Sequence, residues 1–108
     1  MTAVRVCAIA DLEQYVPLRV ELERVDVAVV RVGEDIFAIE DVCSHGEVPL
    51  SDGDVEIENG VCTIECALHG SRFDLTTGKP TGPPASMAVP VYPVEIIGDI
   101  VYLKLENG

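Results

Sequence analysis

The chain has 108 residues and a mass of 11.6 kDa, which is enough for one domain with a hydrophobic core. Hydrophobic residues make up 48% of the sequence and charged residues 24%, so the composition excludes a disordered chain. Nineteen acidic against seven basic residues give a formal charge of -12, which excludes a protein that neutralises nucleic-acid phosphates. Such an acidic balance fits basic protein partners, or it serves solubility alone.

The first half of the sequence predicts short strands separated by turns. A brief helical turn is expected at residues 11–15, and apolar side chains then alternate with charged ones over residues 16–22, as in a half-buried strand. A β-branched run follows at residues 27–32. A glycine turn at residues 33–35 leads from it into an apolar run at residues 36–39.

The second half continues this pattern. Asn59-Gly60 favours a two-residue hairpin turn between apolar runs, and Gly98-Asp99 fits a type II′ turn in the same setting. Seven prolines and nine glycines punctuate the chain. The sequence therefore predicts an all-β fold, a small antiparallel sandwich or barrel, with residues 1–108 forming a single domain.

We expect neither a secretory leader nor a membrane helix. The apolar run at residues 6–10 is too short for a leader, and the longest uncharged stretch, residues 80–94, holds five prolines. The expected location is the cytoplasm. In that compartment the four cysteines are expected to be thiols or metal ligands rather than disulfides.

Cysteine and histidine occur together in two short segments. Cys43 is followed by His45, and Cys66 by His69, each pair in a turn-rich loop after an apolar strand. Thiolate and imidazole bind borderline metals well, and these are the only two histidines of the sequence. We therefore predict a metal site. Cys7 and Cys62 stand apart in Val- and Ile-rich runs, where a thiol packs as a small hydrophobic group.

Two kinds of metal centre fit two sulfur and two nitrogen ligands. A single structural zinc would accept them, but zinc sites usually pair cysteine with cysteine and histidine with histidine at close spacing. Cys-x-His followed by Cys-x-x-His instead suits a two-iron centre, in which each loop gives a sulfur to one iron and a nitrogen to the other. That is the arrangement of a Rieske [2Fe-2S] cluster, and a structural zinc module is the alternative.

The sequence resembles the Rieske family, and more closely the Rieske ferredoxins of bacterial oxygenase systems. The resemblance covers nearly the whole chain, with residues 43–46 similar to the first cluster loop and residues 66–74 to the second. It implies one [2Fe-2S] cluster per chain with four ligands, Cys43 and Cys66 on the inner iron and His45 and His69 on the outer iron.

The resemblance also assigns the surroundings of the cluster. Residues 77–79 and 82–85 are similar to the turn and the proline loop that close over it, so Pro83 is expected beside the cluster. Ser71 matches a serine that donates a hydrogen bond to a cluster sulfur. The implied cluster-binding part is two loops inserted between strands, at about residues 41–85.

Three departures from the family pattern bear on the reduction potential and on the loops. The interval between His45 and Cys66 is a few residues longer than usual, with the extra length placed at residues 52–59. The cysteines that form a disulfide between the loops of high-potential members are absent. Phe73 stands where those members have a tyrosine that donates to a cluster sulfur. Because fewer donors stabilise the reduced cluster less, we expect a low-potential centre.

The resemblance implies an electron carrier without catalytic residues rather than an enzyme by itself. Four ligands leave no open position for substrate, and using both histidines excludes an oxygenase iron site and a histidine-dependent catalytic triad. The implied partners are an NAD(P)H-dependent ferredoxin reductase and a terminal oxygenase of the aromatic-ring dioxygenase type. No nucleic acid or membrane is expected, and the chain is expected to be a monomer.

Two other redox functions are open alternatives. The chain could serve as a small Rieske subunit of another redox complex, such as nitrite reductase, or as a ferredoxin of Fe–S assembly. The acidic residues bear on the partner in each case, since residues 34–65 hold ten of them and no lysine or arginine. Four alternate along the chain and would share one side of an extended segment: Asp52, Asp54, Glu56 and Glu58. They predict either a docking patch for a basic partner or a solvated hairpin.

Overall fold

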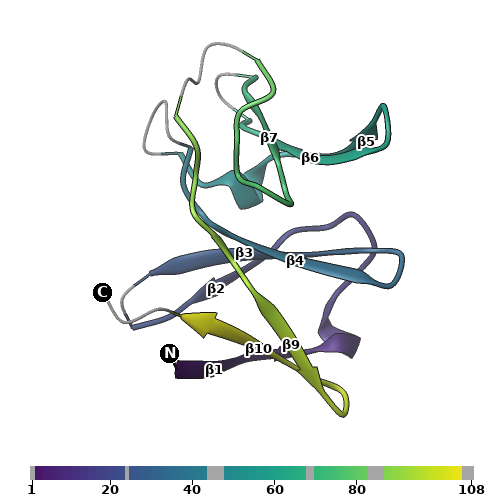
Figure 1. The fold of residues 1–108 in the computed structure, drawn as a ribbon, viewed down its shortest axis with the longest axis vertical. Coiled ribbons are helices and arrows are strands. Elements are labelled where there is room, and N and C mark those ends of the chain that lie inside the picture. Colours follow the sequence, from purple (N-terminus) through teal and green to yellow (C-terminus); the bar gives the residue numbers. More distant parts are fainter. Residues whose placement is uncertain (1, 24, 44–47, 68–69, 83–86, 106–108) are drawn as a thin grey trace.

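The structure, a computed structural model, describes residues 2–23, 25–43, 48–67, 70–82 and 87–105. These residues form three antiparallel sheets and two short 3-10 helices (Figure 1). No helix within them is long and apolar enough to cross a membrane.

Strands from both ends of the chain form the first two sheets. The first sheet has the order β1 (Thr2–Ala8), β10 (Ile100–Leu105), β9 (Val94–Ile97). The second has the order β2 (Leu18–Glu21), β3 (Asp26–Val32), β4 (Asp35–Glu40), β8 (Val91–Tyr92). A 3-10 helix, η1 (Ile9–Asp11), follows β1.

The third sheet is inserted between β4 and β8. It has the order β5 (Val55–Glu58), β6 (Val61–Glu65), β7 (Arg72–Asp74), and the 3-10 helix η2 (Leu50–Asp52) precedes it. Ile39 of β4 pairs with Val91 of β8, so the chain leaves the second sheet and returns to it at neighbouring strands. Figure 1 shows the third sheet at one end of the molecule and the other two sheets at the opposite end. The predicted all-β fold with an inserted part is confirmed.

Strand β3 is buried on both faces because it lies between two hydrophobic cores. Val27 and Val29 pack in the core shared with the first sheet, whereas Ala28 and Val30 pack in the core shared with the third. All four are 0% exposed. A strand covered on both sides carries a continuous apolar run rather than an alternating one, which explains the β-branched stretch in the sequence.

Both predicted hairpin turns are present. Asn59 and Gly60 have φ values of 52° and 80°, as a type I′ turn requires, and the flanking residues pair as Glu58 with Val61. Gly98 has φ 63° at the first central position of the turn between β9 and β10, which fits type II′.

Two local predictions near the N-terminus are wrong. The helical turn forms at Ile9–Asp11 rather than at residues 11–15, and the Asp11 carboxylate accepts a hydrogen bond from the Ala8 N–H at 3.1 Å. The strand predicted for residues 16–22 is confined to Leu18–Glu21. Tyr15, with φ 65°, donates its N–H to the Arg31 carbonyl, so the chain turns just before β2 and leaves Val16 48% exposed.

Candidate metal centre

Cys43 stands at the entrance of the first loop, shortly after β4. Its N–H donates to the Val48 carbonyl oxygen at 2.8 Å, which joins the described residues on the two sides of the first loop. The residue is 2% exposed and belongs to the core between the second and third sheets. The fold therefore holds this thiol in the apolar base of the loop.

Cys66 occupies the corresponding place in the second loop, directly after β6. Its N–H donates to the Ser71 carbonyl at 2.7 Å, and its own carbonyl accepts from the Gly70 N–H at 2.9 Å. Gly70 has φ 75°, a conformation that glycine adopts without strain. Cys66 is 0% exposed and lies in the same core as Cys43.

A backbone contact brings the two loops together. A Cβ built on Gly53 would lie 1.5 Å from the Glu65 carbonyl oxygen, one residue before Cys66. Beside this contact, the Glu65 N–H donates to the Asp54 carbonyl at 2.8 Å. The segment leaving the first loop thus runs directly along the strand that enters the second loop, and only glycine allows this approach.

The turn that follows β7 packs against the chain that returns to β8. Gly78 has φ 79°, and a Cβ there would lie 1.8 Å from the Val89 carbonyl oxygen. Val89 donates its N–H to the Gly78 carbonyl at 2.8 Å. Inside the turn, the Asp74 carboxylate accepts from the Thr76 N–H at 2.7 Å. The turn predicted at residues 77–79 is therefore fixed against the chain that returns to β8.

The structure describes only part of the predicted site. It places Cys43, Cys66 and Ser71 between β4 and β8, in the part of the chain that carries both loops (residues 41–90, the loop-bearing part). Ser71 is 0% exposed and lies within the second loop. His45, His69 and Pro83 lie outside the described residues, so the complete ligand set stays a prediction. Within the described ranges no group of three Cys, His, Asp or Glu side chains could hold a metal.

The other two cysteines pack in or against the hydrophobic cores. Cys7 is buried in the core between the first two sheets, and burial, followed by the nearby Asp11, raises the pKa of its thiol. Cys62 packs against the other core, and its pKa is raised by burial and then by Asp35 and Asp74. A raised pKa keeps a thiol protonated, which fits the predicted role of both residues as small packing groups.

The described residues fit an iron–sulfur group. All four cysteines are thiols rather than halves of disulfides. Cys43 and Cys66 offer two sulfur atoms from separate loops in one apolar core, and a hydrophobic surround controls solvent access to such a centre. Phe73, at 0% exposure, belongs to this core too.

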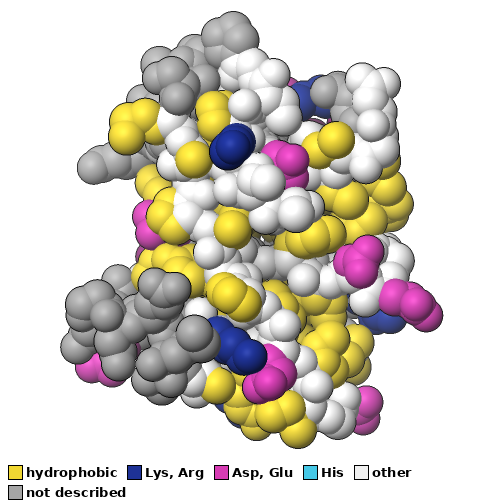
Figure 2. Space-filling model, viewed as in Figure 1, with side chains coloured by type: hydrophobic (Ala, Val, Ile, Leu, Met, Phe, Trp, Pro, Cys, Tyr) yellow, Lys and Arg dark blue, Asp and Glu magenta, His cyan; other side chains and the backbone are white. Residues whose placement is uncertain are grey.

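The four alternating acidic residues at positions 52–58 do not all lie in an extended segment. Asp52 lies in η2, not in an extended segment, so the expectation that it shares one side with the next three acids is wrong. Glu56 pairs with Arg72 at 2.9 Å, and Glu65 lies 3.8 Å from the same guanidinium, which neutralises part of the stretch. Figure 2 shows acidic side chains spread over both ends of the visible face rather than gathered in one patch.

Two structural residues of the loops were missed from the sequence. Gly53 makes the close approach described above, and Asp41 is a buried carboxylate just before Cys43. The available signal for Asp41 was an acidic residue at the end of an apolar strand and two residues before a predicted ligand. For Gly53 there was none beyond a glycine in a turn-rich stretch.

Known proteins identify the class to which this fold and loop arrangement belong. The model of the Rieske [2Fe-2S] domain family matches residues 2–93. The chain belongs to this family and carries one [2Fe-2S] cluster, which confirms the predicted family and cofactor.

Full-length relatives narrow the class to ferredoxins. The 3-phenylpropionate/cinnamic acid dioxygenase ferredoxin subunit of Escherichia coli is 35% identical over 108 residues, covering 100% of this chain and 98% of the relative. The ferredoxin of carbazole 1,9a-dioxygenase from Nocardioides aromaticivorans is 36% identical, with a TM-score of 0.90 over 98% of this chain and 100% of that one. A Sphingomonas yanoikuyae ferredoxin is 30% identical, with a TM-score of 0.86 over 97% and 100%. The chain is an electron carrier, not an enzyme by itself.

Proposed function

We propose that this chain carries single electrons from an NAD(P)H-dependent ferredoxin reductase to a terminal oxygenase of the aromatic-ring dioxygenase type. The observation that carries the proposal is full-length similarity to ferredoxins named for dioxygenases. A further solved structure holds the oxidized ferredoxin of carbazole 1,9a-dioxygenase in complex with its reduced oxygenase. This chain covers 97% of the matched chain at 36% identity and a TM-score of 0.84. We place the protein in the cytoplasm, where the cysteines that do not bind the cluster stay reduced and no disulfide forms.

The proposed ligands are Cys43 and Cys66 for the inner iron and His45 and His69 for the outer iron. Ser71 and Pro83 complete the proposed surroundings, within a cluster-binding part at about residues 41–85 of a single domain over residues 1–108. When bound, the cluster accepts and releases one electron.

The described residues have two roles in this proposal. Cys43 and Cys66 are held in a closed apolar core by backbone hydrogen bonds from their own N–H groups. Buried side chains around them, Leu50, Phe73 and Leu75 at 0–1% exposure, keep water from the inner side of the site. An apolar inner side, together with four protein ligands that would leave no open position, suits electron transfer rather than substrate chemistry.

Two measurements test the proposal. Iron and sulfide analysis with EPR of the reduced, purified protein should show one mixed-ligand [2Fe-2S] cluster and no stoichiometric zinc. Product formation by a terminal aromatic-ring dioxygenase, supplied with NADH and a ferredoxin reductase, should then depend on adding the chain. Zinc in place of iron, or equal turnover without the chain, would contradict the proposal.

A further inference from the structure

Asp41 is a buried carboxylate at the entrance of the first loop. Its side chain is 0% exposed, two residues before Cys43. One carboxylate oxygen accepts from the Ser51 N–H at 2.6 Å, and the other accepts from the Ser51 hydroxyl at 2.6 Å and from Arg19 Nη1 at 2.9 Å. Charge-assisted hydrogen bonds of this kind offset the cost of burying the carboxylate.

These bonds join the two ends of the first loop. Asp41 precedes the loop, and Ser51 follows it in η2. The hydrogen bond between the Cys43 N–H and the Val48 carbonyl closes the same loop nearer its tip. Two sets of hydrogen bonds therefore hold the ends of the first loop together. The set further from the loop tip is made by Asp41 with the backbone and the side chain of Ser51.

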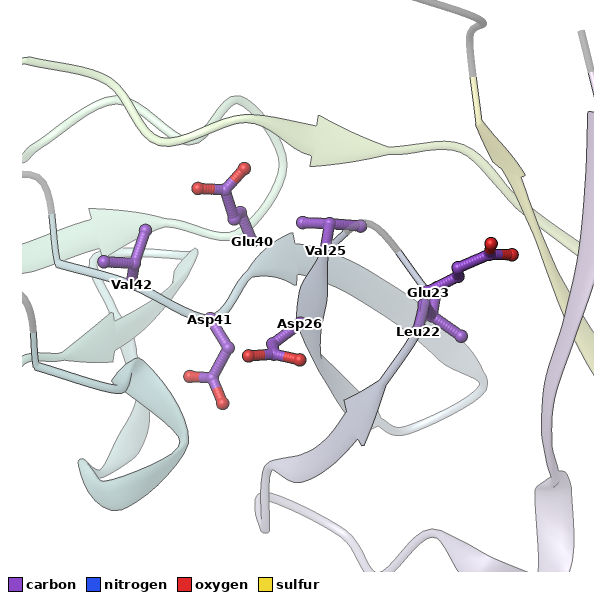
Figure 3. Close-up of a pocket in the computed structure, with 7 residues that line it drawn as sticks. All are labelled: Leu22, Glu23, Val25, Asp26, Glu40, Asp41 and Val42. Atoms are coloured by element: carbon purple, nitrogen blue, oxygen red, sulfur yellow. The ribbon is translucent and has the colours of Figure 1, made fainter.

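Arg19 connects this closure to the second sheet. From β2, its guanidinium contacts Asp41 at 2.9 Å and Asp26 at 2.7 Å. The Asp41 N–H also donates to the Asp26 carbonyl at 2.8 Å. Figure 3 shows the Asp26 and Asp41 carboxylates on one side of the chain, while Glu40 and Val42 point to the other. The base of the loop is thus anchored to strands outside the loop-bearing part.

We propose that Asp41 is a positioning residue for the [2Fe-2S] cluster: by binding Ser51 and Arg19 it fixes the base of the first loop and thereby the placement of Cys43. The inference rests on the proposed function, in particular on Cys43 as a ligand. Groups that hydrogen-bond to a metal ligand typically change the metal affinity by about 10–100-fold when they are mutated, and Asp41 acts one step further out, through the base of the loop.

The test compares two variants with the wild-type holoprotein. Asp41→Asn keeps the side-chain volume but replaces the carboxylate beside Arg19 with an uncharged amide. Ser51→Ala removes one hydrogen-bond donor to Asp41 without changing any charge. Both should shift the g-values of the reduced cluster, and Asp41→Asn should speed cluster loss to an iron chelator by up to about 10-fold, the lower end of the range for groups that contact a ligand directly. Ser51→Ala keeps the backbone hydrogen bond and should have a smaller effect of the same sign. If Asp41→Asn does not fold, Ser51→Ala decides the question.

Two matched controls separate positioning from charge and from global stability. Asp26→Asn removes the carboxylate that lies 2.7 Å from Arg19 but none of the contacts with Ser51, so it should leave the g-values and the rate of cluster loss unchanged. Val101→Ala weakens the opposite core and should lower the melting temperature without shifting the g-values. Wild-type spectra in Asp41→Asn and Ser51→Ala, with cluster loss no faster than in Asp26→Asn, would overturn this inference alone. A wild-type protein without a [2Fe-2S] cluster would overturn the proposed function, and this inference with it.

Discussion

Gly53 and the carbonyl oxygen of Glu65 lie in direct backbone contact, although 12 positions separate them in the sequence. This contact sets the chain leaving the first loop against the strand that ends at Cys66. The φ of Gly53 is -96°, which any residue can adopt. The requirement for glycine is therefore one of space.

We predict that Gly53→Ala destabilises the protein by at least about 1–3 kcal/mol, because the added Cβ meets backbone that cannot turn aside. Thermal and urea unfolding measure the change. Gly82→Ala is the matched control, since a Cβ at that position has no heavy atom of the described residues within 4 Å. A Gly53→Ala protein as stable as the control would show that the two backbones separate at little cost.

Two of the four cysteines should be needed for the cluster, and the other two should not. Cys43→Ser and Cys66→Ser should abolish the cluster and loosen both loops, because metal binding and loop folding are coupled. Cys7→Ser and Cys62→Ser should keep the visible spectrum and iron content, with a packing penalty of about 1–3 kcal/mol. Loss of iron from either of the latter two would place that cysteine in the site.

The reduction potential should lie in the lower part of the Rieske range, near about -150 mV. The chain has Phe73 in place of a hydroxyl donor, and the ten acidic residues at positions 34–65, of which Arg72 offsets a part, disfavour adding an electron nearby. Phe73→Tyr should raise the potential if the new hydroxyl reaches a cluster sulfur. A hydrogen bond stronger by about 1.4 kcal/mol in the reduced state corresponds to about 59 mV. Protein-film voltammetry measures both proteins, and a wild-type midpoint above about +100 mV would contradict the argument.

Stability should fall at alkaline pH, partly through Cys7. Below about pH 8.5 its thiol is protonated in both the folded and unfolded chains. Burial raises the pKa in the folded state, so the unfolded chain releases its proton first as the pH rises. The free energy of unfolding then decreases until the pH passes the folded pKa. Urea unfolding from pH 8 to pH 10 should show a shallower decrease for Cys7→Ala, and equal slopes would contradict this assignment.

Docking to the reductase should depend on salt if the acidic residues near the loops take part. Asp52→Lys and Asp54→Lys together should slow reduction by the reductase at low salt, and rising ionic strength should slow the wild type. Glu56 is a poorer target, because Arg72 already pairs with it. Stopped-flow reduction between about 0.01 M and 0.15 M salt measures the effect, and rates unchanged in both comparisons would leave only a role in solubility.

Local patterns predicted much of the fold because strands and hairpin turns depend on neighbouring residues. Asn59-Gly60 and Gly98 take the backbone conformations that their turns require. The start of β2 was wrong because a contact between Tyr15 and Arg31, distant in sequence, decides it. The alternation of acids did not reveal that Asp52 belongs to η2.

The loop scaffold was harder to predict than the cysteines it holds. Cys43 and Cys66 stand out by residue type and spacing, and the structure brings both into one core. The roles of Asp41 and Gly53 depend on partners that folding brings near, Arg19 for the first and Glu65 for the second. No periodicity in the sequence points to such pairs.

Because β4 and β8 are neighbouring strands, the loop-bearing part could be transferred as one segment into another protein. The Glu40 N–H donates to the Pro90 carbonyl at 2.9 Å, so about fifty residues leave and return through neighbouring strands. The turn of a hairpin in an unrelated sheet could be replaced by this segment, because the two ends of the segment lie as close together as two paired strands. That recipient would have to supply an apolar strand face in place of Ala28 and Val30, because the insert shares its core with β3. Engineering a redox centre into another β-protein would therefore mean moving the insert together with the strand face on which it packs.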